Sequence, residues 1–379
     1  MLVVEFKTRA SKAQQASIDE AIRTGQFVRN KCLRFWMDNK GASKHDLSKR
    51  CAVLAKEFDF ANKLNAQARQ ASAERAWSAI DRFFMNCKQA VRPVGYPQFK
   101  KNSRSVEYKT SGWKLTAHNR IKFTDKHTIG ELRLIGSRDL SLYSEKDIKR
   151  VRLVRRADGY YCQFCIAVDR IEALEPTGSV VGLDVGLASF YTDSNGVKAS
   201  NPRYLRKSEA KLKKLQRRLS RCKKGSNNRR KARQRLAKQH LKISRQRKDH
   251  AVKLARCVVI SNDLIVLEDL KIRNMVKNHC LAKSISDAGW YQFRRWLEYF
   301  AEVFGRSLVS VAPHYTSEQC YRCKAIVEKS LSTRTHVCQC GCELDRDENA
   351  AINILNIGLN TVGHTEIYAS GDPTALLVA

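Results

Sequence analysis

Five of the thirteen cysteines crowd into one short stretch near the C-terminal end of the chain, and their spacing restricts how that stretch can fold. They are Cys320, Cys323, Cys338, Cys340 and Cys342. Two close-set cysteine pairs separated by a short loop are typical of a four-cysteine tetrahedral zinc site. An odd total of cysteines that cluster in this way favours metal binding over disulfides.

Four of the five cysteines are enough to complete a zinc site. We prefer Cys320, Cys323, Cys338 and Cys340, because Gly341 directly after the last of them suits a tight knuckle turn. Cys342 is a substitute for either of the two later ligands, and a set of free thiols is the alternative to a metal site. Four thiolates leave no open position for a substrate, so we expect this zinc to be structural.

The charge of the chain is strongly positive, with 71 Lys and Arg against 37 Asp and Glu, a formal net charge of +34. Residues 203–248 alone hold 21 Lys or Arg and one Glu. The break at 223–228 predicts two basic helices joined by a turn, with an apolar stripe along the first. Such a density of positive charge favours a polyanionic partner, since phosphates would neutralise it with release of counterions. A merely solvated surface is the alternative.

The first 176 residues predict a β-rich region interrupted by helices. The opening segment MLVVEFK alternates like a strand, residues 12–88 contain no proline and have a helical composition, and short strand patterns follow from Val91. This order suggests a small β-barrel with a helical block inserted after its first strand. The N-terminal residues do not form a signal peptide, and no apolar run is long enough for a membrane span, so we expect a cytoplasmic, nucleoid-associated protein.

Candidate nucleic-acid contacts follow from cations and aromatic residues in these regions. Aromatic residues interleaved with Lys and Arg around Phe99 suit base stacking and phosphate contact, although ordinary packing within strands and helices would explain them too. The candidates are Arg69, Gln70, Arg75, Tyr96, Lys100, Lys101, Arg104, Lys213, Arg217, Arg218, Arg229 and Arg230.

Three acidic residues stand where catalytic carboxylates would be expected. Asp184 interrupts an apolar strand, Glu268 follows the strand segment IVL, and Asp347 opens the predicted helix ENAAINIL. A fold that brings them to one edge of a mixed sheet would create three repelling carboxylates, and bound cations would relieve that repulsion. Magnesium prefers such hard oxygen ligands, and two ions about 4 Å apart would suit phosphodiester hydrolysis.

Neighbouring acids offer alternatives to this assignment. Asp269 competes with Glu268, but strand alternation puts it on the opposite side, where it suits a helix N-cap. Asp345 competes with Asp347, mainly as a residue that supports the site. The alternative for Asp184 is a buried acid whose oxygens have hydrogen-bond partners in the protein and bind no metal.

In their order along the chain, the motifs GLDVGL, IVLEDLKIRNM and the cysteine cluster followed by DRDENAAINIL resemble the TnpB family of insertion-sequence proteins, which is related to compact type V CRISPR nucleases. The segments YPQFKK and RVRLVRRADGYYCQFCIAVD are also similar to that family. The second cysteine pair departs from the family pattern, because CxCG with an extra Cys342 stands where CxxCG is common.

The resemblance implies a multidomain α+β architecture. A β-barrel wedge domain would comprise 1–10 and 91–176, and a helical recognition domain 11–90. A RuvC-like nuclease domain of the RNase H fold would comprise 177–315 and 344–360, with the basic helical hairpin at 203–250. A zinc-binding insert at 316–343 and a flexible tail at 361–379 complete the expected layout.

The resemblance also implies an activity. Such proteins bind a guide RNA made from the transposon end, use it to find double-stranded DNA and read a short adjacent DNA motif themselves. By motif, Asp184, Glu268 and Asp347 match the three RuvC acids, so we expect an active Mg²⁺-dependent endonuclease with two Mg²⁺ and one structural Zn²⁺. The alternatives are a nuclease-silent RNA-guided regulator and a transposase or accessory protein of DNA transposition. A separate transposase is a further partner that the resemblance implies.

Overall fold

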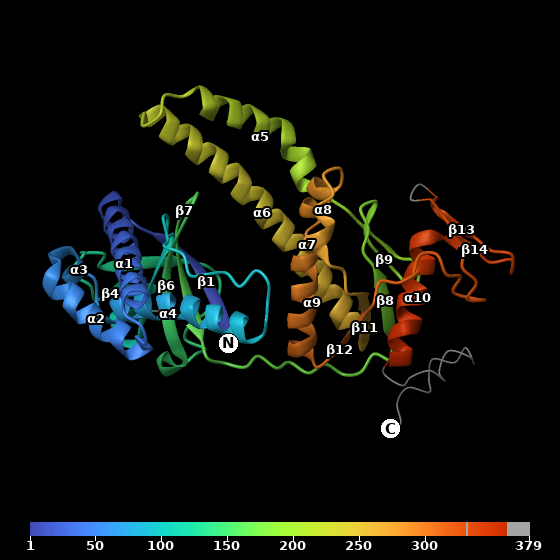
Figure 1. Ribbon diagram of the computed structural model, residues 1–379, viewed down its shortest axis with the longest axis horizontal. Coiled ribbons are helices and arrows are strands. Elements are labelled where there is room, and N and C mark those ends of the chain that lie inside the picture. Colours follow the sequence, from blue (N-terminus) through green and yellow to red (C-terminus); the bar gives the residue numbers. More distant parts are fainter. Residues whose placement is uncertain (118, 331–332, 362–379) are drawn as a thin grey trace. The chain divides into compact units, whose positions relative to one another are not determined.

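A computed structural model of the chain describes residues 1–117, 119–330 and 333–361. The chain divides into two compact units, Met1–Arg170 and a second that begins at Ile171 (Figure 1). None of the helices in the described residues has both the length and the apolar character that a membrane span requires. The tail expected at 361–379 lies outside these residues except for Thr361.

In its described residues, the first unit contains one sheet and four α-helices, and these helices lie between the first and second strands of the chain. Its strands are β1 (Leu2–Arg9), β2 (Ser105–Lys109), β3 (Trp113–Ala117), β4 (Arg120–Phe123), β5 (Glu131–Ile135), β6 (Ile148–Arg156) and β7 (Gly159–Ile166). Its helices are α1 (Lys12–Asp38), α2 (Lys44–Glu57), α3 (Asp59–Lys63) and α4 (Ala66–Lys88).

The seven strands form one antiparallel sheet in the order β2-β6-β7-β1-β5-β4-β3. Strand β1 lies near the middle of the sheet, where Val4 pairs with Phe164 of β7 and Lys7 with Ile135 of β5. No backbone pairing joins the edge strands β2 and β3 within the described part of this unit, although the three residues Thr110–Gly112 connect these two strands along the chain. Strand β2 also packs against α4.

Helices α1, α2 and α4 of the first unit begin after residues whose side chains satisfy free backbone N–H groups. The Ser11 hydroxyl accepts from the backbone of Gln14 and the Ser43 hydroxyl from that of Asp46, and each helical residue bonds back in a capping box. The Asn65 side chain starts α4 in a similar way. Helices α1 and α4 therefore have fixed starting points from which they pack on the sheet.

The second unit is built on a five-stranded mixed sheet. Its strands are β8 (Val180–Asp184), β9 (Ser189–Asp193), β10 (Lys198–Ser200), β11 (Leu264–Glu268) and β12 (Ser307–Val311), in the order β10-β9-β8-β11-β12. Strands β8, β11 and β12 are parallel, whereas β9 runs antiparallel to β8. The helices are α5 (Tyr204–Arg221), α6 (Asn227–Ser261), α7 (Ile272–Met275), α8 (Ala282–Ala288), α9 (Trp290–Phe304) and α10 (Arg346–Thr361).

Helices cover both faces of this sheet. On one face, α10 packs against β8 and β11 (Figure 1), where Val266 of β11 is buried with Ile354 and Leu355 of the helix. The aromatic stripe of α9 and the C-terminal part of α6 pack on the other face, around Phe293. The aromatic side chains of α9 therefore belong to the core of this unit.

A long helical hairpin extends from the second unit (Figure 1). Helices α5 and α6 correspond to the two predicted basic helices, and the turn between them falls at the predicted break. Helix α6 continues to Ser261, beyond the predicted end of the hairpin at 250, because Ala251, Ala255 and Val259 are buried in the core under the sheet. A final two-stranded ribbon, β13 (Thr335–Val337) with β14 (Glu343–Asp345), leads directly into α10.

Candidate functional site

Asp184 and Glu268 end two neighbouring parallel strands. The register pairs Leu183 of β8 with Leu267 of β11, so the next positions place Asp184 and Glu268 side by side. Two positions earlier, Val266 is buried against α10, and side chains alternate along a strand. Both acids therefore belong to the sheet face that α10 covers.

The approach of α10 to β8 brings the third acid to the same edge. A Cβ atom built on Gly182 would lie 2.2 Å from the carbonyl oxygen of Ala351, so helix and strand are in direct backbone contact there. From that contact, Asp347 lies one turn back along α10, about 6 Å. Asp184 lies two residues further along β8 than Gly182, which is a similar distance of about 6.6 Å. Asp347 is therefore placed over the end of the strand that carries Asp184.

The electrostatics of the three acids agree with this geometry. Burial, followed by the negative charges of Glu268 and Asp347, raises the pKa of Asp184 well above its ordinary range. Burial also raises the pKa of Glu268, against the effect of a hydrogen bond from Thr316. The edge of the sheet therefore carries an excess of negative charge in a partly dry setting, which favours a bound cation.

Two of the three acids already have partners in the zinc-insert segment. The Thr316 hydroxyl donates to Oε1 of Glu268, and Nη1 of Arg334 lies 3.9 Å from Oδ1 of Asp347. Among the described residues, only the cysteine region brings three or more ligand atoms within 4.8 Å of one another. The carboxylate oxygens of the three acids thus lie along one edge of the sheet without converging on a single position. A pair of ions about 4 Å apart can use ligands spread over a longer distance than a single ion can.

The competing acids have structural partners of their own. Asp269 pairs with Arg294 of α9, on the opposite face from Glu268, as strand alternation predicts. The suggestion that it caps a helix is wrong, because α7 begins at Ile272 without any side-chain cap. Asp345 caps α10, since its Oδ1 accepts the backbone N–H of Asp347 at 2.9 Å, and its other oxygen pairs with Lys198.

The four preferred cysteines lie together. Their sulfur atoms are within 4.8 Å of one another, with 3.7 Å between Cys320 and Cys340 and 3.4 Å between Cys323 and Cys338. Tetrahedral zinc with bonds of about 2.3 Å requires sulfurs about 3.8 Å apart, so this arrangement fits the ion. Cys342 lies outside this set of four but belongs to a second group, in which its sulfur and the ligand atoms of Cys320 and His336 lie within 4.8 Å of one another.

Backbone geometry shapes the second cysteine knuckle. Gly341 has φ +79° and donates its N–H to Cys338 O at 3.0 Å, which confirms the predicted turn. Although burial opposes the thiolate of Cys320, hydrogen bonds from the backbone of Cys323 and Arg322 and from His336 lower its pKa to about 5. A preformed thiolate is the form that binds metal.

Some of the candidate nucleic-acid contacts on the basic hairpin are exposed to solvent, and others have protein partners. Arg217, Arg218 and Arg230 are exposed. Lys213 pairs with Glu209 at 3.0 Å, and Arg229 donates to the carbonyls at the end of α5, so it closes the hairpin.

The candidate contacts of the first unit also divide into two groups. Arg69 donates to the backbone of Ala61 and Leu64, and Arg75 to Ser105, so these guanidinium groups have structural partners. Gln70 is half-buried. The exposed candidates are Tyr96, Lys100, Lys101 and Arg104.

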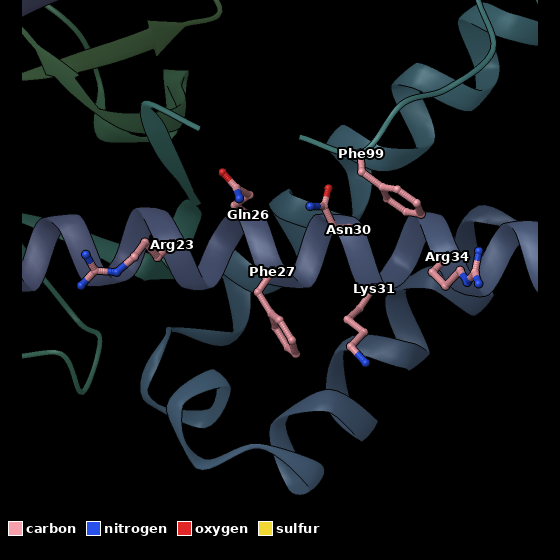
Figure 2. Close-up of a pocket in the computed structure, with 7 residues that line it drawn as sticks. All are labelled: Arg23, Gln26, Phe27, Asn30, Lys31, Arg34 and Phe99. Carbon is pink, nitrogen blue, oxygen red and sulfur yellow. The ribbon is translucent and has the colours of Figure 1, made fainter. Parts of the chain in front are cut away.

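A groove of about 490 Å³ runs along α1, and the sequence did not point to most of its residues (Figure 2). Figure 2 shows three cations and one aromatic ring along the helix, Arg23, Phe27, Lys31 and Arg34, with Phe99 beside them. The side chains of Gln26 and Asn30 hold the backbone of residues 100–103 beside the helix. The spacing of four, four and three residues along 12–38 was the signal that could have revealed this surface.

Family models match two parts of the chain. Residues 163–279 match the model OrfB_IS605, described as "Probable transposase", and residues 290–354 match the model of the Cas12f1-like TNB domain. The first match contains Asp184 and Glu268, and the second contains the cysteines and Asp347.

Similar proteins cover most of the chain. A protein of Streptomyces pristinaespiralis, named as a candidate RNA-guided DNA endonuclease, is 35% identical over 305 residues, 80% of this chain and 74% of that protein. InsQ of Escherichia coli K12, with the same description, is 29% identical over 97% of this chain and 95% of its own length. Three mimivirus proteins named TnpB-like match about a third of this chain.

Solved structures share the fold. The chain resembles Cas12f1 in a complex with guide RNA and target DNA with a TM-score of 0.54 and 15% identity, over 91% of this chain and 81% of that one. It resembles the mini RNA-guided endonuclease CRISPR-Cas_phi3 with a TM-score of 0.59 and 8% identity, over 94% and 92%.

Proposed function

Because the chain belongs to the TnpB family of RNA-guided DNA endonucleases, we propose that it cuts double-stranded DNA at sites chosen by a guide RNA, and that Asp184, Glu268 and Asp347 form the cutting site. The observation that carries this proposal is the common edge of the second sheet at which the three acids lie. The raised pKa values of Asp184 and Glu268, and the hard oxygen donors of all three acids, suit Mg²⁺ in a RuvC-like nuclease.

The residues of the edge have separable tasks. Asp184 and Glu268, fixed by adjacent strands, would hold cations, and Asp347 would complete the ligand set from the first turn of α10. Two Mg²⁺ ions bound there would activate a water for attack on phosphorus and stabilise charge on the leaving oxygen. Asp345 caps α10 and so keeps Asp347 at the start of the helix.

The positive surfaces supply the binding part of the function. The exposed arginines of the α5–α6 hairpin would contact phosphates of the guide RNA or target DNA, and the α1 groove would hold a strand through stacking and charge. Guide pairing would select the sequence, and the protein would read only backbone shape and a short adjacent motif. The guide RNA would come from the transposon end.

Zinc at the four cysteines would have a structural role. The segment around them has only a small apolar cluster of its own, so the metal would supply much of its folding free energy.

The decisive experiment is Asp184→Ala in the full chain purified with its co-purifying RNA. We expect loss of site-specific cleavage in Mg²⁺, while RNA binding and DNA binding stay within about twofold of wild type. A variant that cuts at the full rate would exclude this site.

The description of one matching family as a transposase family favours a second candidate, an accessory role in DNA transposition. Purified protein incubated with transposon ends separates the two. Strand-transfer products would support transposition, whereas site-specific breaks without such products would support the guided endonuclease.

A further inference from the structure

The entry into the cysteine segment is clamped onto α10 by two buried asparagines. The Asn353 amide donates to the carbonyls of Thr316 at 3.0 Å and Gln319 at 2.6 Å. One turn earlier, Asn349 donates to Gln319 O at 2.8 Å and accepts from Tyr321 N at 3.0 Å. Both asparagines are almost completely buried, at 0% and 1% exposure, so these bonds are shielded from water.

The clamped loop presents one hydroxyl group to the cutting site. Thr316 is itself buried, and its Oγ1 donates to Oε1 of Glu268, a residue 48 positions earlier in the chain. A carboxylate has two oxygens and about four acceptor positions, so this bond fixes the rotation of the group while Oε2 remains available. The contact is therefore a means of orienting Glu268 without neutralising it.

We propose that Thr316 is a positioning residue for Glu268, through which the folded cysteine segment sets the geometry of the cutting site. This inference rests on the proposed nuclease function. It assigns the cysteine segment a role beyond its own stability. Cys320 lies four residues after Thr316, and the asparagine clamp fixes the backbone between them, so the folded segment determines where Thr316 lies.

The hydroxyl contact can be tested apart from the fold, because the backbone bond from Asn353 uses the carbonyl of Thr316 and not its side chain. Thr316→Val keeps the shape of the side chain and removes the donor. Thr316→Ser restores the donor without the methyl group. Ser317→Ala is a matched control, because it removes a neighbouring hydroxyl that accepts from Arg346 and does not touch the acids.

The first measurement is the Mg²⁺ dependence of cleavage by the RNA-loaded protein. We expect Thr316→Val to need about tenfold more Mg²⁺ for half-maximal rate, since loss of a hydrogen bond to a charged group leaves the Glu268 carboxylate without its fixed orientation. Thr316→Ser and Ser317→Ala should match wild type, and RNA affinity should be unchanged in all three. A Thr316→Ser protein that requires as much Mg²⁺ as Thr316→Val would overturn the proposal.

The second measurement does not require cutting. Mn²⁺ binding without target DNA, followed by the electron paramagnetic resonance of the free ion, should weaken about tenfold in Thr316→Val and stay unchanged in Ser317→Ala. Equal Mn²⁺ binding and equal Mg²⁺ dependence in wild type and Thr316→Val would refute the role of Thr316 alone, provided that wild type cuts and Asp184→Ala does not. Wild type that fails to cut, or Asp184→Ala that cuts fully, would instead refute the nuclease proposal.

Discussion

Asp269 pairs with Arg294 on one face of the second sheet, although the preceding residue, Glu268, has its side chain on the other face. Adjacent acids thus have different roles set by the alternation of a strand. We expect Asp269→Asn to keep cleavage within about threefold of wild type, since an exposed ion pair contributes only about 0–1 kcal/mol. Glu268→Gln should lose about a hundredfold or more, as for other groups that stabilise charge at a reacting centre. Single-turnover cleavage measures both, and equal losses would contradict the assignment.

The close contact of α10 with β8 leads to a second prediction, on Gly182→Ala. The added methyl group would meet the carbonyl of Ala351 and must displace α10 at that point, one turn after Asp347. We expect a loss of stability of about 1–3 kcal/mol and a drop in cleavage of more than about tenfold.

Gly358→Ala provides the matched control on the same helix. Its methyl group would meet Val266 at 2.5 Å, three turns away from Asp347. We expect a similar loss in melting temperature with a much smaller loss of cleavage below that temperature. Equal cleavage losses would mean that stability alone, and not the position of Asp347, determines the effect.

The sequence predicted those parts of the site that depend on local pattern. An acid that ends an apolar strand, such as Asp184, and the fixed spacing of Cys320 and Cys323 are visible in the chain itself. The alternation that separates Asp269 from Glu268 follows from strand geometry. The predicted end of the hairpin at residue 250 was less accurate. Helix α6 continues beyond it because Ala251 and Ala255 pack into the core of the second unit.

Contacts between distant segments could not be predicted in this way. The bond from Thr316 to Glu268 depends on how α10 clamps a loop, and nothing in the local sequence around Thr316 marks it. The α1 groove depends on where the segment that carries Phe99 crosses the helix. Arg69 is a residue for which the sequence suggested a contact that the fold uses otherwise. This cation on α4 donates to backbone carbonyls instead of facing solvent.

A third prediction concerns the zinc ligands. Purified protein should hold one zinc per chain, and Cys323→Ser and Cys338→Ser should each lose most of it, because a three-thiolate site is incomplete. Cys342→Ser should keep the full amount, since Cys342 lies outside the four-sulfur set. Elemental analysis of the purified variants measures this, and loss of zinc in Cys342→Ser alone would reverse the ligand assignment.

A fourth prediction concerns the pH dependence of stability in the first unit. Glu107 is 4% exposed and pairs with Arg150 and Arg152. Burial opposes its ionisation, but these two partners lower its pKa below the ordinary 4.5. The stabilising effect is therefore fully present above about pH 4.5 and is lost as pH falls through the lower pKa of the folded state.

We expect Glu107→Gln to lower the free energy of unfolding at pH 7 by about 2–3 kcal/mol. The difference from wild type should shrink as the pH falls below about 4.5, where Glu107 becomes protonated. Urea unfolding between pH 7 and pH 3 measures it, with the exposed Glu145→Gln as a control that should change stability by less than about 0.5 kcal/mol at pH 7. A difference that grows in acid would contradict the ion-pair explanation.

The exposed arginines of the hairpin allow a test of the nucleic-acid surface through salt dependence. Each phosphate contact contributes about 0.7 to the slope of log affinity against log salt for a single strand and about 0.9 for duplex DNA. Replacing Arg217, Arg218 and Arg230 by Gln should therefore reduce the slope by about 2–3. A control with the same loss of charge replaces the exposed Lys12, Lys44 and Lys56 of the first unit. If the control reduces the slope as much as the hairpin variant, total charge and not the hairpin governs binding.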